Sequence, residues 1–329
     1  MKISLILPLF DRRNAGWKPL ESALGQTMAR GGYEIIVVVG NESTKDAHVD
    51  ALLQQCDAVV HVDADPNQPD QEIPILMAGY ARSTGDVLFF MEGHTELDPN
   101  CCAMIAEHFR GHPQSRIAWA PRIHSNTSAL GALIGIHSKR HESRVAEHGG
   151  FGLGANSVIT REYFEYLGRL DPRYMRFGER VLLERVMREN VAIGRLDLPL
   201  ATHYDDMPLS QLIEIATAAG EAKYRYYNAP ASDAGAGPVQ VRHGIYRVAN
   251  CAAGALILFP LATALRGLFL RASIIAQSAG GKSAYRLSAY RLFVPGLGFA
   301  DLSGFCRARI QALRAGRRRG LVPSPDVRR

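Results

Sequence analysis

The stretch GDVLFFMEGHTELDPN, residues 85–100, decides how the rest of the chain is interpreted. Its apolar run, residues 87–91, predicts a strand buried on both faces that ends abruptly before a Pro-containing turn. Glu92 and His94 follow directly, two positions apart, so both project from one side of an extended backbone. Ligands bind at the carboxyl ends of strands in open α/β sheets. Carboxylate oxygen and imidazole nitrogen suit a divalent metal such as Mn²⁺, which predicts a metal site here; a solvated surface pair is the alternative.

Strand and helix patterns alternate on the N-terminal side of this stretch. Two further apolar runs, residues 2–10 and 33–39, flank a helical pattern over residues 17–29, which is the order of a right-handed crossover unit. The elements expected after them are a helix, a strand and a helix, at residues 47–56, 58–62 and 75–83. This alternation predicts an α/β fold with a mostly parallel, Rossmann-like sheet and helices on both faces.

Glycine placement argues against a dinucleotide-binding domain. No G-x-G-x-x-G follows the first apolar run, so the most specific test for that domain fails. The later GGFGLG, residues 149–154, follows a polar, helix-like stretch instead of a strand. We interpret it as a flexible loop.

Charge is divided unevenly along the 329 residues. Residues 1–240 contain 23 Lys and Arg against 30 Asp and Glu, whereas residues 241–329 contain 15 against 2, so the two parts carry about −7 and +13. Such asymmetry is typical of a chain that addresses a polyanion, either nucleic acid or an anionic membrane surface. No zinc-finger, helix-turn-helix or RNP pattern accompanies the arginines, so we expect the membrane surface and no nucleic acid.

The C-terminal third is expected to be a separate, membrane-associating helical region. A small-residue, Pro- and Gly-rich stretch at 229–240 predicts a linker between residues 1–228 and residues 241–329. Residues 248–265 are uncharged, which is the lower limit for spanning a bilayer, although Pro260 weakens that interpretation. Arginines recur among apolar residues after it, as in helices that lie on an anionic membrane: Arg266, Arg271, Arg286 and Arg291.

Cysteine usage and the N-terminus bear on the compartment. Five cysteines without a C-x-x-C pair favour reduced thiols, and the N-terminus enters a strand without a basic-then-apolar leader. We therefore expect a cytoplasmic protein that is peripheral on the inner face of the cell membrane, with a single span as the alternative.

Several segments, taken in order, resemble one family. LESALGQ at 20–26 resembles its L-x-S-x-L-x-Q helix, EIIVVV at 34–39 its second strand, and residues 79–86 its G-x-x-x-S-x-G-D. The family's D-x-D then falls on Glu92-Gly93-His94, and NSVITREYFEYLGRLDPRY, residues 156–174, resembles its acceptor-side segment. Over residues 3–205 the sequence is similar to the family 2 glycosyltransferases, which have the GT-A fold.

The resemblance implies an activity and a site. It implies inverting transfer of a sugar from a nucleotide-diphosphate donor to a hydroxyl of a lipid-linked or polymeric acceptor, as in cell-envelope polysaccharide synthesis, with Mn²⁺ or Mg²⁺. The implied metal ligands are Glu92 and His94, completed by His203 after a strand expected at 192–200, and the implied base is Glu179. The implied substrate contacts are Pro8, Phe10, Asp11, Asn41, Glu42, Gly154 and Asn156.

Three departures from the family pattern keep alternatives open. The usual Asp at the tip of the second strand is replaced by Gly40-Asn41, so base recognition falls to Asn41 or Glu42. Glu and His stand in the D-x-D positions, and the usual acidic pair is Glu179-Arg180. The alternatives are a non-catalytic pseudo-glycosyltransferase that binds a nucleotide or glycan, and a membrane-anchored interaction protein.

Overall fold

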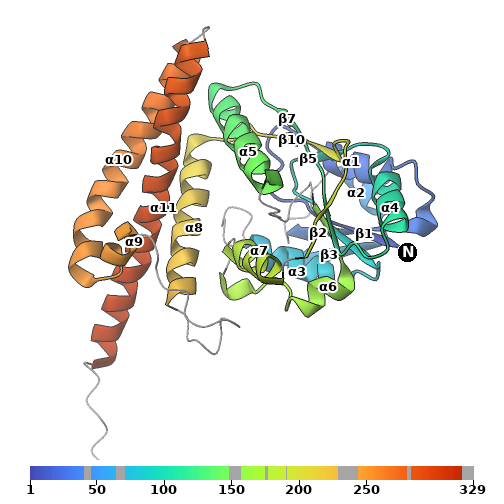
Figure 1. Cartoon of the computed structure of the whole chain (residues 1–329), viewed down its shortest axis with the longest axis horizontal. Coiled ribbons are helices and arrows are strands. Elements are labelled where there is room, and N and C mark those ends of the chain that lie inside the picture. Colours follow the sequence, from blue (N-terminus) through green and yellow to red (C-terminus); the bar gives the residue numbers. More distant parts are fainter. Residues whose placement is uncertain are drawn as a thin grey trace, which may run out of the picture. The chain divides into compact units, whose positions relative to one another are not determined.

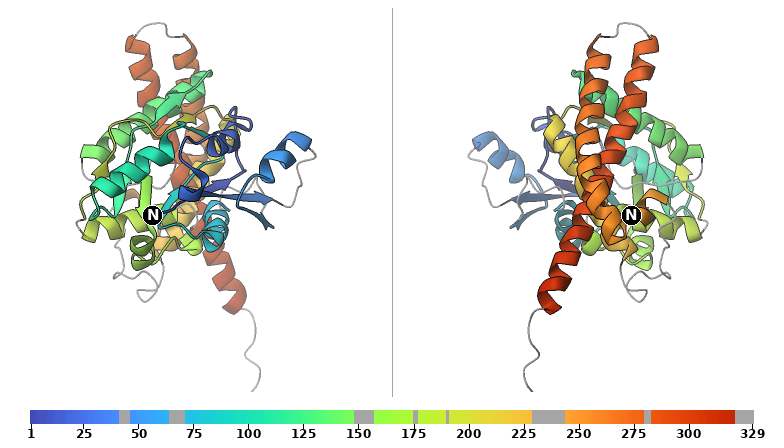
Figure 2. Two further views of the ribbon diagram at one scale, coloured as in Figure 1. Left: turned by 90° about the vertical axis from the view of Figure 1, so that its right-hand side faces the viewer. Right: turned by 90° about the vertical axis from the view of Figure 1, so that its left-hand side faces the viewer.

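The computed structural model describes eight ranges of the chain, residues 1–40, 46–63, 71–147, 157–174, 177–189, 191–228, 244–279 and 283–320 (Figures 1 and 2). The chain divides into two compact units, Met1–Pro208 and Leu209–Arg329. The boundary thus lies before helix α8 (Leu209–Tyr227), whereas the sequence placed it after this helix, because α8 packs against the C-terminal helix α11 (Ser283–Gly320). The linker expected at 229–240 lies outside the described residues.

Within the described residues the first unit is built on a seven-stranded sheet with the order β3–β2–β1–β4–β8–β6–β9. β1 pairs in parallel with β2 and β4, β2 with β3, and β6 with β9, whereas β8 runs antiparallel to both neighbours, so the sheet is mostly parallel. The strands are β1 (Ile3–Pro8), β2 (Tyr33–Gly40), β3 (Ala58–Val62), β4 (Val87–Phe90), β6 (Ile117–Trp119), β8 (Ser157–Thr160) and β9 (Gly194–Arg195).

Helices cover both faces of this sheet (Figure 1). Successive side chains of β4 point to opposite faces, so Phe89 packs with one set of helices and Phe90 with the other. The first face is covered by α1 (Lys18–Leu24) and α4 (Cys101–Gly111), and the second by α3 (Glu72–Arg82), α6 (Arg161–Tyr166) and α7 (Phe177–Glu189). The other helical elements of this unit among the described residues are α2 (Ala47–Leu53), α5 (Ala129–Glu147) and two 3-10 turns, at Arg30–Gly32 and Pro172–Tyr174. The expected α/β fold is therefore confirmed.

A small second sheet lies beyond the carboxyl end of β4. Its order is β5–β10–β7, from β5 (Thr95–Leu97), β10 (Ala201–Tyr204) and β7 (Ile123–Ser125). His203 is paired in register with Thr95 on one side and with His124 on the other. The strand expected at 192–200 was wrong: residues there form only the two-residue β9, and His203 lies inside β10 instead of after a strand.

The second unit contains α8, α9 (Gly244–Ala249), α10 (Ala252–Ala279) and α11, which confirms a helical C-terminal region. The uncharged stretch at 248–265 is divided between α9 and α10, and Pro260 lies inside α10. Among the described helices, α10 is long and apolar enough to cross a membrane by length and composition, over Ala252–Ser278.

Candidate active site

The turn after β4 is shaped by Gly93. A Cβ at this position would clash with the backbone carbonyl oxygens of Phe10 and Pro8, at the end of β1, so only glycine lets the two strand exits approach this closely. The same exit loop holds Asp11 and Arg13 at φ values of 49° and 47°, in the left-handed region that non-glycine residues rarely adopt. Close approach and local strain at one strand edge are common where a fold positions functional groups.

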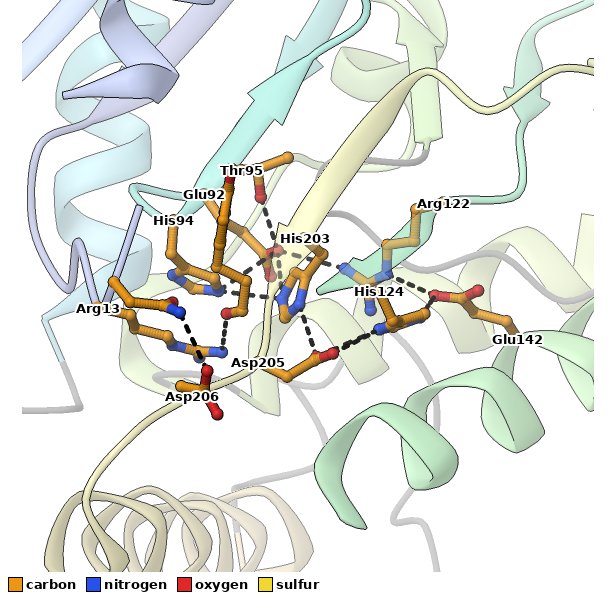
Figure 3. Close-up of polar contacts among 12 residues, drawn as sticks. Arg13, Glu92, His94, Thr95, Arg122, His124, Glu142, His203, Asp205 and Asp206 are labelled. Carbon is orange, nitrogen blue, oxygen red and sulfur yellow. Dashed lines mark hydrogen bonds and ion pairs between the residues drawn. The ribbon is translucent and has the colours of Figure 1, made fainter. Parts of the chain in front are cut away.

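Three metal-ligating atoms meet beside this turn (Figure 3). Nε2 of His94 lies 3.0 Å from Nε2 of His203, and Oε2 of Glu92 lies 3.2 Å from the His203 nitrogen and 3.7 Å from the His94 nitrogen. Two of these residues come from the turn after β4 and the third from β10. The structure therefore brings together the three residues that the sequence predicts as metal ligands.

The second nitrogen of each imidazole fixes which nitrogen carries the proton. Nδ1 of His94 lies 3.0 Å from the backbone oxygen of Asp11, and a carbonyl oxygen only accepts, so this nitrogen donates. Nδ1 of His203 lies 2.8 Å from Oδ1 of Asp205, and it donates for the same reason. With both Nδ1 atoms engaged in this way, the two Nε2 atoms face each other and the Glu92 carboxylate, an arrangement suited to a shared cation.

The electrostatic surroundings of His94 and Glu92 favour the protonation states in which these side chains bind metals, a neutral imidazole and an ionised carboxylate. Burial, reinforced by the charges of Arg13 and His203, holds the pKa of His94 well below its usual value of 6.5, so the ring is neutral. Burial opposes ionisation of Glu92, but its electrostatic interaction and hydrogen bond with His203, and the nearby Arg122 guanidinium, keep its pKa well below 4.5. The pair therefore supplies a neutral imidazole and a carboxylate at neutral pH.

The donor set fits a divalent ion. Ligands about 2.1 Å from one ion and at right angles to each other lie about 3 Å apart, and wider angles separate them further. The distances of 3.0, 3.2 and 3.7 Å among these atoms fit one shared ion. Two imidazoles and one carboxylate leave further coordination positions for a substrate, as in catalytic metal sites. Nitrogen ligands favour Mn²⁺ over Mg²⁺.

A closed ring of side chains supports His203 and Glu92 from behind (Figure 3). Asp205 accepts from His203 and lies 3.1 Å from Nδ1 of His124, whose Nε2 is 3.3 Å from Oε1 of Glu142. Arg122 donates to Glu142 and, over 3.3 Å, to Oε2 of Glu92, which closes the ring.

Asp205, His124 and His203 form a second group with metal-ligand spacing. Burial opposes charge on both new members, but hydrogen bonds to Asp205 and Glu142 raise the pKa of His124, and hydrogen bonds from His124 and His203 lower that of Asp205. Because the Asp205 carboxylate already faces a donor on each side, we interpret it as the group that orients His203 and not as a ligand.

Sequence reasoning missed the ring residues Arg122, His124, Glu142 and Asp205. A signal for three of them was present: R-I-H at 122–124 and H-Y-D at 203–205 repeat the two-residue spacing of E-G-H at 92–94, and each places two polar side chains on one side of a strand. Glu142, on helix α5, follows no such pattern.

The other expected site residues lie in several places. Asp11 contacts His94: its backbone oxygen accepts from Nδ1, and one of its carboxylate oxygens lies 3.6 Å from the same nitrogen. Pro8 and Phe10 line the turn at Gly93 through their carbonyl groups. Glu179 is partly buried in the first turn of α7. Asn41, Glu42, Gly154 and Asn156 are outside the described residues.

Comparisons with known proteins extend the fold assignment. No protein-family model and no curated protein matches the sequence. Among solved structures, S. aureus TarS residues 1–349 in complex with UDP matches 96% of this chain over 92% of its own length, with a TM-score of 0.50 and 11% identity. The fold therefore resembles a glycosyltransferase fold. The complex of TarS 1–349 with UDP-GlcNAc matches at a TM-score of 0.46 and 10% identity, and it adds nothing to this conclusion.

Proposed function

We propose that this chain is a metal-dependent, inverting glycosyltransferase of the family 2 type. It would transfer a sugar from a nucleoside-diphosphate donor to a hydroxyl of a lipid-linked or polymeric acceptor. The observation that carries the proposal is the convergence of two imidazole Nε2 atoms and a carboxylate at the carboxyl end of β4. This is the edge at which sheets of this kind bind ligands, and the TarS structure with a similar fold contains UDP.

The three converging side chains would hold Mn²⁺ or Mg²⁺. Bound there, the ion supplies charge neutralisation for the departing diphosphate. Glu92, His94 and His203 hold their ligand atoms in place through partners already present: the Asp11 carbonyl oxygen for one ring and Asp205 for the other. Little reorganisation is then needed on donor binding, which favours catalysis by preorganised charge.

Glu179 is the proposed base that takes the proton of the attacking hydroxyl. It is partly buried in the first turn of α7, and partial burial and neighbouring charge can tune the proton affinity of a carboxylate to the acceptor hydroxyl. A base of this kind contributes about 10² to 10⁴ in rate.

The test of this function is Glu179→Gln, which keeps the shape of the side chain and removes its charge. We expect turnover to fall by about 10² to 10⁴ while affinity for the donor changes little. Glu189→Gln, at the exposed end of the same helix, is the matched control and should retain the parent activity. Near-normal turnover in Glu179→Gln would place the base elsewhere. A parent protein that binds UDP but transfers sugar to no acceptor would support the pseudo-glycosyltransferase instead.

A further inference from the structure

Helix α10 buries mostly small residues and exposes several large aliphatic ones. The buried residues among its described positions are Gly254, Ala255, Ala262, Leu270 and Ser273. Large aliphatic side chains are instead exposed by 52–68%, at Leu256, Ile257, Leu261, Leu268 and Ile275. A helix packed in a water-soluble domain normally shows the reverse distribution.

Four of the exposed side chains form one stripe. Ile257, Leu261, Leu268 and Ile275 follow each other at intervals of four, seven and seven residues, which places them on one side of the helix. Arg271 is exposed on the same side, between Leu268 and Ile275. We call these five residues the α10 stripe.

The interior of the second unit uses close backbone packing and polar contacts. A Cβ on Gly220 of α8 would clash with the backbone of Asp301, and one on Gly304 of α11 with that of Thr217, so these helices approach more closely than larger residues allow. Arg266 of α10 donates to Ser303 over 2.9 Å and to Thr217 over 3.2 Å. Small-residue contacts and polar links between helices are typical of helix packing at membranes, where aliphatic side chains face lipid.

We propose that the α10 stripe docks on an anionic lipid bilayer, with its aliphatic side chains in the boundary between headgroups and acyl chains. The charge of residues 241–329, about +13, complements such a surface, because each Lys or Arg near it adds favourable free energy. Arg271 reaches the headgroups from within the stripe by extending its charged end toward water. This inference does not depend on the proposed function.

The positive charge of the C-terminal region also distinguishes a lipid surface from the two other arrangements, a dimer through the stripe and an α10 that spans the bilayer. Two copies of this strongly basic region would repel each other, which disfavours a dimer through the stripe. A spanning α10 would place Arg271 and the half-buried Arg266 at hydrocarbon depth, where each charge is costly. Glu214 and Arg225 are exposed on α8, which indicates that the second unit also faces water.

The test measures sedimentation of the full-length protein with vesicles of phosphatidylcholine, with and without phosphatidylglycerol. The decisive variant is Leu268→Glu with Ile275→Glu; Leu198→Glu in the first unit, at 63% exposure, is the matched control, and far-UV circular dichroism checks that each variant folds. We expect the parent and the control to bind anionic vesicles far better than neutral ones. The double variant should bind about 100-fold more weakly, at roughly tenfold for each lost aliphatic side chain. Arg271→Gln should weaken binding about fivefold.

Three results would overturn the proposal: equal sedimentation of the double variant and the parent, equal binding of the parent to neutral and anionic vesicles, or protein that 1 M salt does not loosen at all, which indicates a span. Light scattering of the protein without lipid measures its oligomeric state, which tests whether the stripe instead binds a second copy of the chain. A parent dimer that the double variant converts to a monomer would assign the stripe to a second copy of the chain.

Discussion

Glu92 and His94 were predictable because they follow a strongly apolar strand at a two-residue spacing, so their direction is set by local geometry. His203 was identified only through a family resemblance, because a ligand more than a hundred residues away has no local signature. Asp205, His124 and Arg122 stayed hidden because their roles depend on the register of β10 against β7. Such register is decided by packing and not by the short strand sequences themselves.

Asp205 is expected to act through His203. Asp205→Asn removes the acceptor charge that keeps the proton on Nδ1 and leaves Nε2 free, so affinity for Mn²⁺ should fall by about 10- to 100-fold. Titration calorimetry of the full-length protein with Mn²⁺ measures this directly. Asp50→Asn, at an exposed position of α2, is the control. Unaltered Mn²⁺ affinity in Asp205→Asn would remove this carboxylate from the account.

Acid sensitivity follows from the buried neutral state of His94. Because its pKa is lower in the folded than in the unfolded chain, its contribution to stability is present above pH 6.5 and is lost as the pH falls below that value. The lowered pKa of Glu92 likewise contributes stability above pH 4.5 that is lost as the pH falls further. The raised pKa of His124 has the opposite effect: its contribution to stability is present below pH 6.5 and is lost as the pH rises.

We therefore expect the free energy of unfolding without metal to fall between pH 6.5 and 5.5, by up to about 1.4 kcal/mol from His94. His94→Gln should flatten this slope. Urea titrations followed by tryptophan fluorescence at the two pH values test it. The same slope in parent and variant would show that His94 is not the responsible group.

Element by element, the long and strongly patterned segments were predictable and the short ones were not. β1, β2 and β4 are nearly continuous apolar runs because both of their faces are covered by helices. The three strands of the small sheet have three or four residues each, too few for a period to be distinguished. The placement of α8 with the C-terminal helices was missed because its partners are far along the chain.

The turn between β4 and β5 should tolerate no side chain at Gly93. Gly93→Ala forces a Cβ against the Phe10 and Pro8 carbonyl oxygens, so we expect a loss of about 1–3 kcal/mol in the free energy of unfolding. Gly111→Ala, at the end of α4 with open space around its Cβ position, should leave stability equal or slightly higher. Denaturant titration compares the two variants. Equal stability of Gly93→Ala and the parent would mean that the two strand exits are not held this closely.

On the scale of the whole molecule, the two units differ in charge and in optical signal. Both tryptophans, Trp17 and Trp119, belong to the first unit, so tryptophan fluorescence reports on its unfolding alone, whereas far-UV circular dichroism reports on both. UDP with Mn²⁺ at about 100 times its Kd should stabilise the first unit by about 2.7 kcal/mol. The fluorescence transition should move to higher temperature without an equal shift of the helical signal of the second unit. Equal shifts of both signals would show that the units unfold as one.

The central claim is that Glu92, His94 and His203 form one metal site that binds the donor diphosphate. The most direct measurement is the melting temperature by tryptophan fluorescence with UDP, in the presence and absence of Mn²⁺, for the parent, Glu92→Ala and His94→Ala, with His48→Ala on exposed α2 as control. We predict that UDP raises the melting temperature of the parent and the control only with Mn²⁺ and leaves both site variants unmoved. An unchanged Mn²⁺-dependent shift in Glu92→Ala and His94→Ala would contradict the claim.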